Sequence, residues 1–446
     1  MSRANPLIAN RPYNPLNRRP ATALVSGDGS CNEKPETVKD GSQDWPISTE
    51  RDARNGLPRH FFDGCHGLQK NNQMLQRLPN LTKTPARQIP HTKPLLFDGD
   101  RLFCSRGNRI IATWDDGRSF ETVCTLQIPG SLRLAVLSTL SRRITRTDSF
   151  RMRKVANGNH AFVFRRGIYI QKPASDVAVC TMRIPRGSRP VSLETNNQGG
   201  LVFGEYFANR ARKEVHIYGS DDGGLNWDVV YTFEPGAIRH VHGIAYDQWD
   251  DCYWICTGDY DDENRLIRAS CDFADVQTMR QGGQRNRFFA MQIFENNIVA
   301  ATDTPFESNY VYVIDKQTGE ARRAIEVENS CFFTCVVGDR VFVSTNAERS
   351  PVNDNNNSHI WMGHKSLKKW DRVISRPVDV VDKLGRLPGL RNGFFQHPHY
   401  AFPEGTNPGR HLVCYGLGLK GQHDSLMFYD VQHLAQEEPV DLAKAA

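Results

Sequence analysis

A short pattern that occurs twice in this chain constrains its fold more than any other feature. Positions 220–227 read Ser-Asp-Asp-Gly-Gly-Leu-Asn-Trp, and positions 113–120 read Thr-Trp-Asp-Asp-Gly-Arg-Ser-Phe. Both copies place a hydroxyl residue, an Asp, a Gly and an aromatic ring at the same offsets. A short Asp side chain accepts hydrogen bonds from nearby N–H groups, and Gly adopts a positive φ without a clash. Each copy therefore predicts a tight turn between two strands.

Weaker versions of this turn follow at a nearly constant spacing. Asp115 and Asp222 lie 107 positions apart, which is about two units of the roughly 40–50 residues expected for a four-stranded propeller blade. Turns near Asp272, Asp315 and Trp370 continue the period after the motif has decayed. We therefore predict an all-β chain folded as a β-propeller with seven blades, six being the alternative count. The expected blades are 95–127, 155–185, 189–235, 239–283, 286–327, 331–378 and 391–431.

Most segments between the turns fit short, half-buried strands. Residues 287–294 and 298–302, for example, are rich in Phe, Ile, Val and Ala and are separated by a polar turn. Residues 131–154 differ, because Leu132, Val136 and Leu140 recur at helical spacing ahead of several arginines. We expect one helical insertion between the first two blades.

The N-terminal segment lacks any such periodicity. Residues 1–95 contain 14 Lys and Arg against 8 Asp and Glu, which leaves 42 of each (56 − 14 and 50 − 8) for the remainder. The net charge of +6 therefore lies in this segment, which also holds 11 of the 24 prolines. We expect residues 1–94 to form an irregular, partly disordered Pro-rich arm, residues 95–435 to form the propeller, and residues 436–446 to form a C-terminal tail.

Composition also bears on partners and location. The charge-balanced propeller lacks the clustered basic excess of a nucleic-acid-binding surface, so no nucleic-acid partner is expected. No run of about 18 apolar residues is present, so no membrane span is expected. The 11 cysteines are odd in number and scattered through predicted strands, which fits reduced thiols in a cytoplasmic protein. The oligomeric state stays open.

One rim of the predicted propeller carries the side chains best suited to chemistry. The first strand of a blade begins, and the second ends, on the same face of the disc, because the two strands run antiparallel. In four consecutive blades an acid follows the second strand, and His, Gln or Arg stands at the start of several first strands. The candidate catalytic residues are His240, His242, Asp259, Asp303, Glu348 and His399. The candidate substrate-binding residues are Glu205, Arg239, Gln284, Arg285, Arg287 and Arg349.

Each of these groups has a functional and an ordinary explanation. His240 and His242 share one face of a strand, as do His397 and His399 in the last blade. Such pairs, with Gln284 or Gln396, can bind a divalent metal ion, but satisfied core histidines explain them equally well. The arginines can clamp a carboxylate or can form salt bridges with neighbouring acids. Acids after strands are also common turn residues.

The two Asp turns resemble those of the sialidase/BNR-repeat (Asp-box) superfamily, and the likeness in period covers residues 95–431. The segments Arg-His-Val-His-Gly (239–243), Thr-Gly-Asp (257–259) and Thr-Asp-Thr-Pro (302–305) are similar to propeller proteins of bacterial surface-polysaccharide loci. These resemblances imply a glycan as ligand. No Tyr/Glu nucleophile pair of the sialidases can be placed here, so a sialidase is not predicted. A looser similarity to propeller polysaccharide lyases implies neutralisation of a uronate by Arg or a metal ion.

We therefore expect a carbohydrate-active or carbohydrate-binding propeller that acts on an acidic glycan, as a glycoside hydrolase or as a polysaccharide lyase. In a hydrolase the rim acids would divide into general acid and nucleophile or base. In a lyase a histidine would remove the proton next to the neutralised carboxylate. The alternative is a non-catalytic scaffold that binds a protein partner, because fold alone does not fix activity. Convergence of the rim residues would favour the first expectation.

Overall fold

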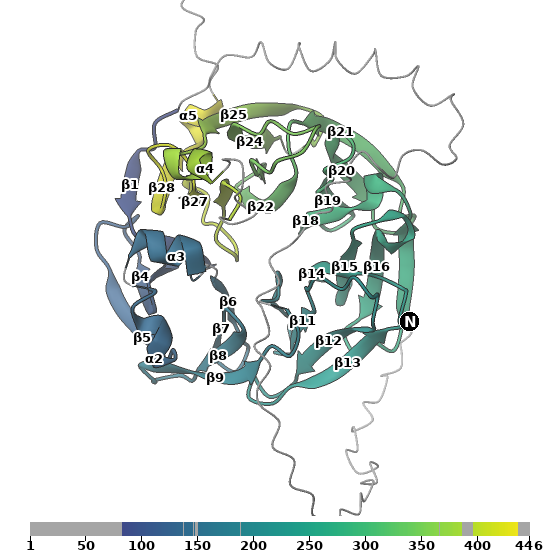
Figure 1. Ribbon diagram of the computed structural model, residues 1–446, viewed down its shortest axis with the longest axis horizontal. Helices are drawn as coiled ribbons and strands as arrows, with labels where there is room; N and C mark the ends of the chain where they lie inside the picture. The colour runs from purple at the N-terminus through teal and green to yellow at the C-terminus, as the bar shows by residue number, and fades with distance from the viewer. Residues whose placement is uncertain are drawn as a thin grey trace, which may run out of the picture. The chain divides into compact units, whose positions relative to one another are not determined.

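Seven blades of antiparallel strands follow one another in chain order around a central axis (Figure 1). The computed structural model describes residues 83–435, apart from 137, 146, 148–149, 188, 365 and 386–395. Residues 1–82 of the expected arm and the expected tail, 436–446, lie outside the described residues. Five blades are separate four-stranded sheets, and two are joined edge to edge by the parallel pair Thr125↔Val177 and Leu126↔Ala178. The predicted all-β propeller with seven blades is confirmed.

The first three blades consist of short strands joined by tight turns. Blade one contains β2 (Lys93–Asp98), β3 (Arg101–Arg106), β4 (Arg109–Thr113) and β5 (Glu121–Leu126). Blade two contains β6 (Phe150–Lys154), β7 (His160–Phe164), β8 (Gly167–Gln171) and β9 (Val177–Arg183). Blade three contains β10 (Glu194–Thr195), β11 (Leu201–Gly204), β12 (Val215–Ser220) and β13 (Asp228–Phe233).

The next three blades carry most of the rim side chains. Blade four contains β14 (His240–Asp247), β15 (Cys252–Gly258), β16 (Arg265–Ser270) and β17 (Val276–Gln281). Blade five contains β18 (Phe288–Ile293), β19 (Asn297–Thr302), β20 (Asn309–Asp315) and β21 (Ala321–Val327). Blade six contains β22 (Cys331–Val337), β23 (Arg340–Thr345), β24 (Asn357–Gly363) and β25 (Trp370–Pro377). In Figure 1, β14, β18 and β22 lie nearest the axis.

Blade seven is completed by a strand from the other end of the chain. It contains β26 (His399–Ala401), β27 (His411–Leu417) and β28 (Ser425–Asp430), and its fourth strand is β1 (Arg87–Pro90). β1 pairs antiparallel with β28 from Arg87↔Phe428 to Pro90↔Ser425. The segment 1–94, in which we expected an arm, thus supplies the strand that closes the ring. β1 itself contains one large apolar side chain, that of Ile89, and this pattern is too weak to predict a strand.

The hydrophobic core lies between neighbouring blades. Strand β15 is buried along its whole length, and its Trp254 packs in one cluster with Phe288 and Ile298 of blade five. Similar clusters join the other blades described, because each sheet has a neighbour on both faces. Such burial on two faces explains why the inner strands are continuous apolar runs.

Both Asp turns have the predicted geometry between the third and fourth strands of their blades. Oδ1 of Asp222 accepts hydrogen bonds from Oγ of Ser220 and from the backbone N–H groups of Leu225 and Asn226 at 2.9–3.0 Å. Asp115 accepts equivalent bonds in blade one. The glycines that follow, Gly224 and Gly117, have φ of +90° and +76°. These turns lie on the rim opposite the starts of the first strands.

Helices are few and short among the described residues. The expected insertion between blades one and two contains α2 (Gly130–Arg133) and α3 (Thr139–Thr145). The others are α4 (Val380–Leu384), α5 (Val431–Ala435), η1 (Asp261–Glu263) and η2 (Gln284–Asn286). No helix in the described part of the chain is both long enough and apolar enough to cross a membrane. The nine cysteines of that part carry free thiols.

Candidate functional site

Strand pairing in blade four brings two histidines and an aspartate to one point. β14 begins at His240 and β15 ends at Gly258, and the register places these two residues opposite each other. Asp259 follows Gly258 directly and therefore lies beside the start of β14. The ends of antiparallel neighbours meet at one rim, so Asp259 comes to lie beside two histidines that precede it by 17 and 19 positions.

A β-bulge sets the position of His242 within β14. The register against β15 shifts between Val241 and Gly243, which leaves His242 without a direct partner. Equivalent shifts occur in blades one, five and six at Leu95, Phe289 and Phe332. Bulges re-aim a side chain relative to the regular alternation. Blade four thus carries an imidazole where these three blades carry an apolar side chain.

The two imidazoles and the carboxylate face one another. Nε2 of His242 lies 3.1 Å from Nε2 of His240 and 3.0 Å from Oδ1 of Asp259. Nε2 of His240 lies 3.5 Å from the same oxygen. Each Nδ1 points away to a backbone carbonyl: that of His240 lies 2.9 Å from the Phe207 oxygen, and that of His242 lies 3.0 Å from the Phe288 oxygen. Burial lowers the pKa of His242.

Two arginines and a glutamine surround Asp259. Nη1 of Arg239 lies 2.7 Å from Oδ2, and Nη2 of Arg287 lies 3.1 Å from Oδ1. Nε2 of Gln284 and Nη1 of Arg287 donate to the backbone oxygen of Asp259 at 3.1 and 3.2 Å. Burial alone would raise the pKa of Asp259, but His240 and Arg287 hold it well below its ordinary value. Asp259 is therefore an anion fixed from several sides.

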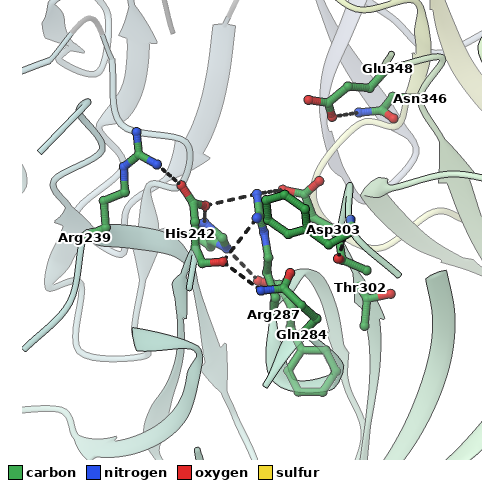
Figure 2. Close-up of polar contacts among 12 residues, drawn as sticks. Arg239, His242, Gln284, Arg287, Thr302, Asp303, Asn346 and Glu348 are labelled. Carbon is green, nitrogen blue, oxygen red and sulfur yellow. Dashed lines mark hydrogen bonds and ion pairs between the residues drawn. The ribbon is translucent and has the colours of Figure 1, made fainter. Parts of the chain in front are cut away.

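Arg287 connects blade four to the acids of blades five and six. Its side chain is 2% exposed, and its Nη2 lies 3.5 Å from Oδ2 of Asp303, which follows β19. Figure 2 shows Arg287 between His242 and Asp303, with Glu348 and Asn346 beyond them on blade six. Burial raises the pKa of Asp303, against the opposing charge of Arg287. Burial also raises the pKa of Glu348 to about 6, although Arg287 and a 3.4 Å hydrogen bond from Asn346 oppose the shift.

The residues that the structure brings together form a group that we call the central cluster. They come from three consecutive blades and lie at or near the start of a first strand or the end of a second strand. The central cluster consists of Arg239, His240, His242, Asp259, Gln284, Arg287, Asp303 and Glu348.

The histidines of blade seven are arranged differently. Nδ1 of His399 lies 2.7 Å from the backbone oxygen of His397, and its ring stacks on Phe333 with centroids 5.2 Å apart. Burial lowers the pKa of His399 to about 3. Nε2 of His397 lies 3.8 Å from Oε1 of Glu348, so this residue, rather than His399, borders the central cluster. His399 is held as a neutral packing residue.

The other three predicted residues differ in their surroundings. Glu205 is fully buried and accepts a 2.9 Å bond from Nε of Arg186 and another from the His216 backbone N–H, which is a structural role. Arg285 is exposed, and no contact within the described residues joins it to the central cluster. Arg349 is half-buried beside Glu348.

Sequence reasoning missed the aromatic side chains of the site. The ring of Tyr206, which follows β11, lies 4.3 Å from that of His240 between centroids. The bulge residue Phe289 lies 5.4 Å from His242 and 4.6 Å from Phe332. Tyr206 comes shortly after the second strand of its blade, as the rim acids do, so its position in the sequence could have predicted that it lies at this rim. The bulge residues gave none, because a bulge depends on pairing between strands.

Three atoms of the central cluster can act together as metal ligands. Nε2 of His240, Nε2 of His242 and a carboxylate oxygen of Asp259 all lie within 4.8 Å of one another. In the described part of the chain, no other set of three His, Cys, Asp or Glu side chains meets this criterion. All three residues are buried.

Comparison with known proteins identifies the architecture. No family model and no curated protein matches the chain. Among solved structures, an oligogalacturonate lyase in complex with manganese is similar with a TM-score of 0.52 and 11% identity, over 79% of this chain and 93% of that one. An ancestral GH74 enzyme (TM-score 0.46, 11% identity, 79% and 47% covered) and a chain of the mitotic checkpoint complex (0.46, 13%, 79% and 96%) are also similar. At these identities the likeness is one of fold alone: the chain shares a β-propeller with the lyase.

Proposed function

We propose that this propeller binds an acidic glycan at the central cluster and acts on it by acid–base chemistry. The observation that carries the proposal is the position of Arg287, which is buried between the anionic Asp259 and the carboxyl group of Asp303, whose pKa is raised. A buried site that holds fixed arginines beside carboxyl groups able to keep a proton suits a ligand with both a carboxylate and hydroxyl groups.

The arginines supply the carboxylate-binding half of the proposed site. Arg239 uses Nη1 on Asp259, while its buried Nε has no hydrogen-bond partner among the described residues. The side-chain oxygen of Gln284 is buried and lacks a partner there as well. A guanidinium has five donors, and a buried polar atom without a partner is costly. A sugar carboxylate and a sugar hydroxyl would satisfy these two atoms.

The carboxyl groups supply the proton-transfer half. The pKa of Glu348, about 6, lies close to neutral pH, where a general acid works best. The imidazoles of His240 and His242 lie on the other side of Arg287, beside Asp259. A hydrolase would use Glu348 and Asp303 as its carboxyl pair, whereas a lyase would use an imidazole as base. The products distinguish these two routes.

The similar lyase structure is consistent with this choice of ligand class. Oligogalacturonate, after which that lyase is named, is an acidic oligosaccharide. Because the likeness is one of fold, the proposal rests on the residues of the central cluster.

A thermal-shift experiment with the full chain tests the proposal. We expect acidic oligosaccharides such as oligogalacturonates to raise Tm, and neutral oligosaccharides of equal length to leave it unchanged. The shift should disappear in Arg239→Gln and persist in Arg118→Gln, since Arg118 is exposed on the opposite rim, where its backbone N–H donates to Asp115. Product analysis of the sugar that binds, for an unsaturated end or a new reducing end, then identifies the reaction. Equal shifts with neutral sugars, or no shift with any acidic sugar, would contradict the proposal and favour a protein-binding scaffold.

A further inference from the structure

We propose that His240, His242 and Asp259 bind a divalent transition-metal ion through Nε2, Nε2 and Oδ1. This inference goes beyond the glycan function and does not depend on it, because it follows from the contacts of these three side chains alone. Their ligand atoms approach one another to 3.0, 3.1 and 3.5 Å.

The hydrogen bonds of the two imidazoles decide which nitrogen carries the proton. Nδ1 of His240 and Nδ1 of His242 each lie beside a backbone carbonyl, at 2.9 and 3.0 Å. A carbonyl oxygen only accepts, so each Nδ1 must donate. An imidazole whose single N–H is on Nδ1 presents a lone pair at Nε2, which is the form that binds a metal ion. Histidine ligands in metal sites are held in this way, with the second nitrogen donating to a carbonyl.

In this form the three ligand atoms point at a common position, and Arg287 contacts one of them, Oδ1 of Asp259. The lone pairs of two Nε2 atoms and of Oδ1 of Asp259 would repel one another at these distances unless a cation lies among them. Ligand atoms about 2.1 Å from a metal are separated by roughly 3.0 Å in octahedral and roughly 3.4 Å in tetrahedral geometry. The observed separations of 3.0, 3.1 and 3.5 Å match this range.

The surroundings of the site supply support and charge balance. Oδ2 of Asp259, the oxygen that is not a proposed ligand, is held by Arg239 at 2.7 Å. Arg287 contacts the ligand oxygen at 3.1 Å and is the competing cation. The arginines are balanced by Asp259 and, across Arg287, by Asp303 and Glu348. The anionic Asp259 thus contacts both arginines, and the carboxyl groups of Asp303 and Glu348 lie beyond Arg287.

The ligand set selects the class of ion. Two imidazole nitrogens and one carboxylate oxygen suit Zn²⁺, Fe²⁺, Co²⁺ or Mn²⁺, whereas Ca²⁺ and Mg²⁺ prefer shells made of oxygen. Such a site with three protein ligands leaves coordination positions open for a bound molecule.

Metal titration of the full chain tests this inference without any sugar. After treatment with a chelator, we expect calorimetry to show one site for Zn²⁺ and for Mn²⁺ and no binding of Ca²⁺ at the same concentration. Co²⁺ should give a visible absorption spectrum typical of nitrogen and oxygen ligands. His242→Gln and Asp259→Asn should each weaken Zn²⁺ binding on the order of tenfold or more. His216→Gln, at a half-buried histidine of β12 outside the site, should bind as the wild type does.

The wild-type measurements keep the inference falsifiable if a variant fails to fold. Absence of Zn²⁺, Mn²⁺ and Co²⁺ binding to the folded wild-type chain would overturn it, and an added proton on one imidazole would then explain the short contacts. Unchanged Zn²⁺ affinity in folded His242→Gln would overturn it as well. Neither result would contradict the glycan proposal, because the thermal shifts with sugars are measured in a separate experiment. That experiment can be repeated with the chelator present.

Discussion

At the residue scale, the central cluster depends on the absence of a side chain at position 258. A Cβ atom added to Gly258 would lie 2.2 Å from Cε1 of His242, well inside van der Waals contact. Both the imidazole and the chain that leads to Asp259 are packed, so neither can move freely. Gly258 therefore allows the end of β15 to approach the ring closely.

Replacing this glycine is expected to disturb the site and the fold together. Gly258→Ala should lower the free energy of unfolding by about 1–3 kcal/mol, because a methyl group is forced into a packed region. Chemical denaturation measures the loss. Gly130→Ala is the control, since a Cβ there meets nothing within 4 Å, and it should change stability little. Equal stability of the two variants would show that His242 moves aside without cost.

Burial of Glu348 makes stability depend on pH. Its pKa rises from 4.5 to about 6, so the folded state holds the proton more tightly than the unfolded chain. Below pH 4.5 the carboxyl group is protonated in both the folded and the unfolded state, and its ionisation does not affect the free energy of unfolding. As pH rises from 4.5 through about 6, that free energy falls by about 2 kcal/mol. Glu348→Gln should remove this dependence and be the more stable protein at pH 7. Urea denaturation of both proteins between pH 4 and 7.5 checks the difference, and parallel curves would contradict the assignment.

The sequence predicted which residue types lie at this rim, but not their contacts. His240, Asp259 and Asp303 could be placed because strand starts and ends alternate along the chain. Glu205 occupies the same sequence position as Asp259 within its blade, yet Arg186 and the His216 backbone hold it in a structural role. Which acid meets which base depends on side-chain packing between blades, and one sequence carries no direct record of that packing.

At the scale of elements, the turn between β12 and β13 is held by one carboxylate. Asp222 accepts three hydrogen bonds with Oδ1 and a fourth from Asn226 with Oδ2. These bonds hold the pKa of Asp222 at about 2, against the raising effect of burial. The turn lies on the opposite rim from the central cluster, so its role is structural.

Substitution in this turn should therefore separate stability from binding. Asp222→Ala is expected to lower the free energy of unfolding by about 1–2 kcal/mol through the lost hydrogen bonds, with unchanged ligand affinity in the folded protein. Thermal melts measure the first quantity and titration the second. Asp221→Ala changes an exposed neighbour and should have little effect. Loss of binding without loss of stability in Asp222→Ala would contradict a structural turn.

Local sequence patterns predict the turns of this protein better than they predict the irregularities of its strands. The Asp turns were predictable because Asp115 and Asp222 bond only to residues within four positions of themselves in the described part of the chain. The bulges at His242, Phe289 and Phe332 were not, because a bulge is a mismatch between two strands and appears only when both are paired.

At the scale of the molecule, the ring is closed by residues from its two ends. β1 pairs with β28 across more than 330 positions of sequence, and Ile89 packs in the cluster that contains Phe428. Without β1, the edge of β28 would present unpaired N–H and C=O groups to solvent. Seven blades were predictable from the period, whereas this closure was not, because a four-residue strand carries little pattern.

Removing the closing strand should destabilise the whole ring. A chain that begins at Lys93 is expected to have a lower Tm than one that begins at Lys83, and a greater tendency to aggregate through the open edge of β28. The two chains differ in β1 and its flanks, so the comparison isolates this strand. Calorimetry and light scattering measure the two effects. Identical melting and solubility would show that the covalent order of the blades is sufficient to hold the ring.

The recurring bulge has a consequence for how such a ring can change. Four inner strands offer the same backbone socket, which Leu95, Phe289 and Phe332 fill with apolar groups and His242 fills with an imidazole. In these four blades the sheet fixes the course of the backbone, and the residue at the bulge fixes which side chain is presented there. An exchange at one of these positions would change the side chain that the bulge presents and leave the supporting sheet as it is.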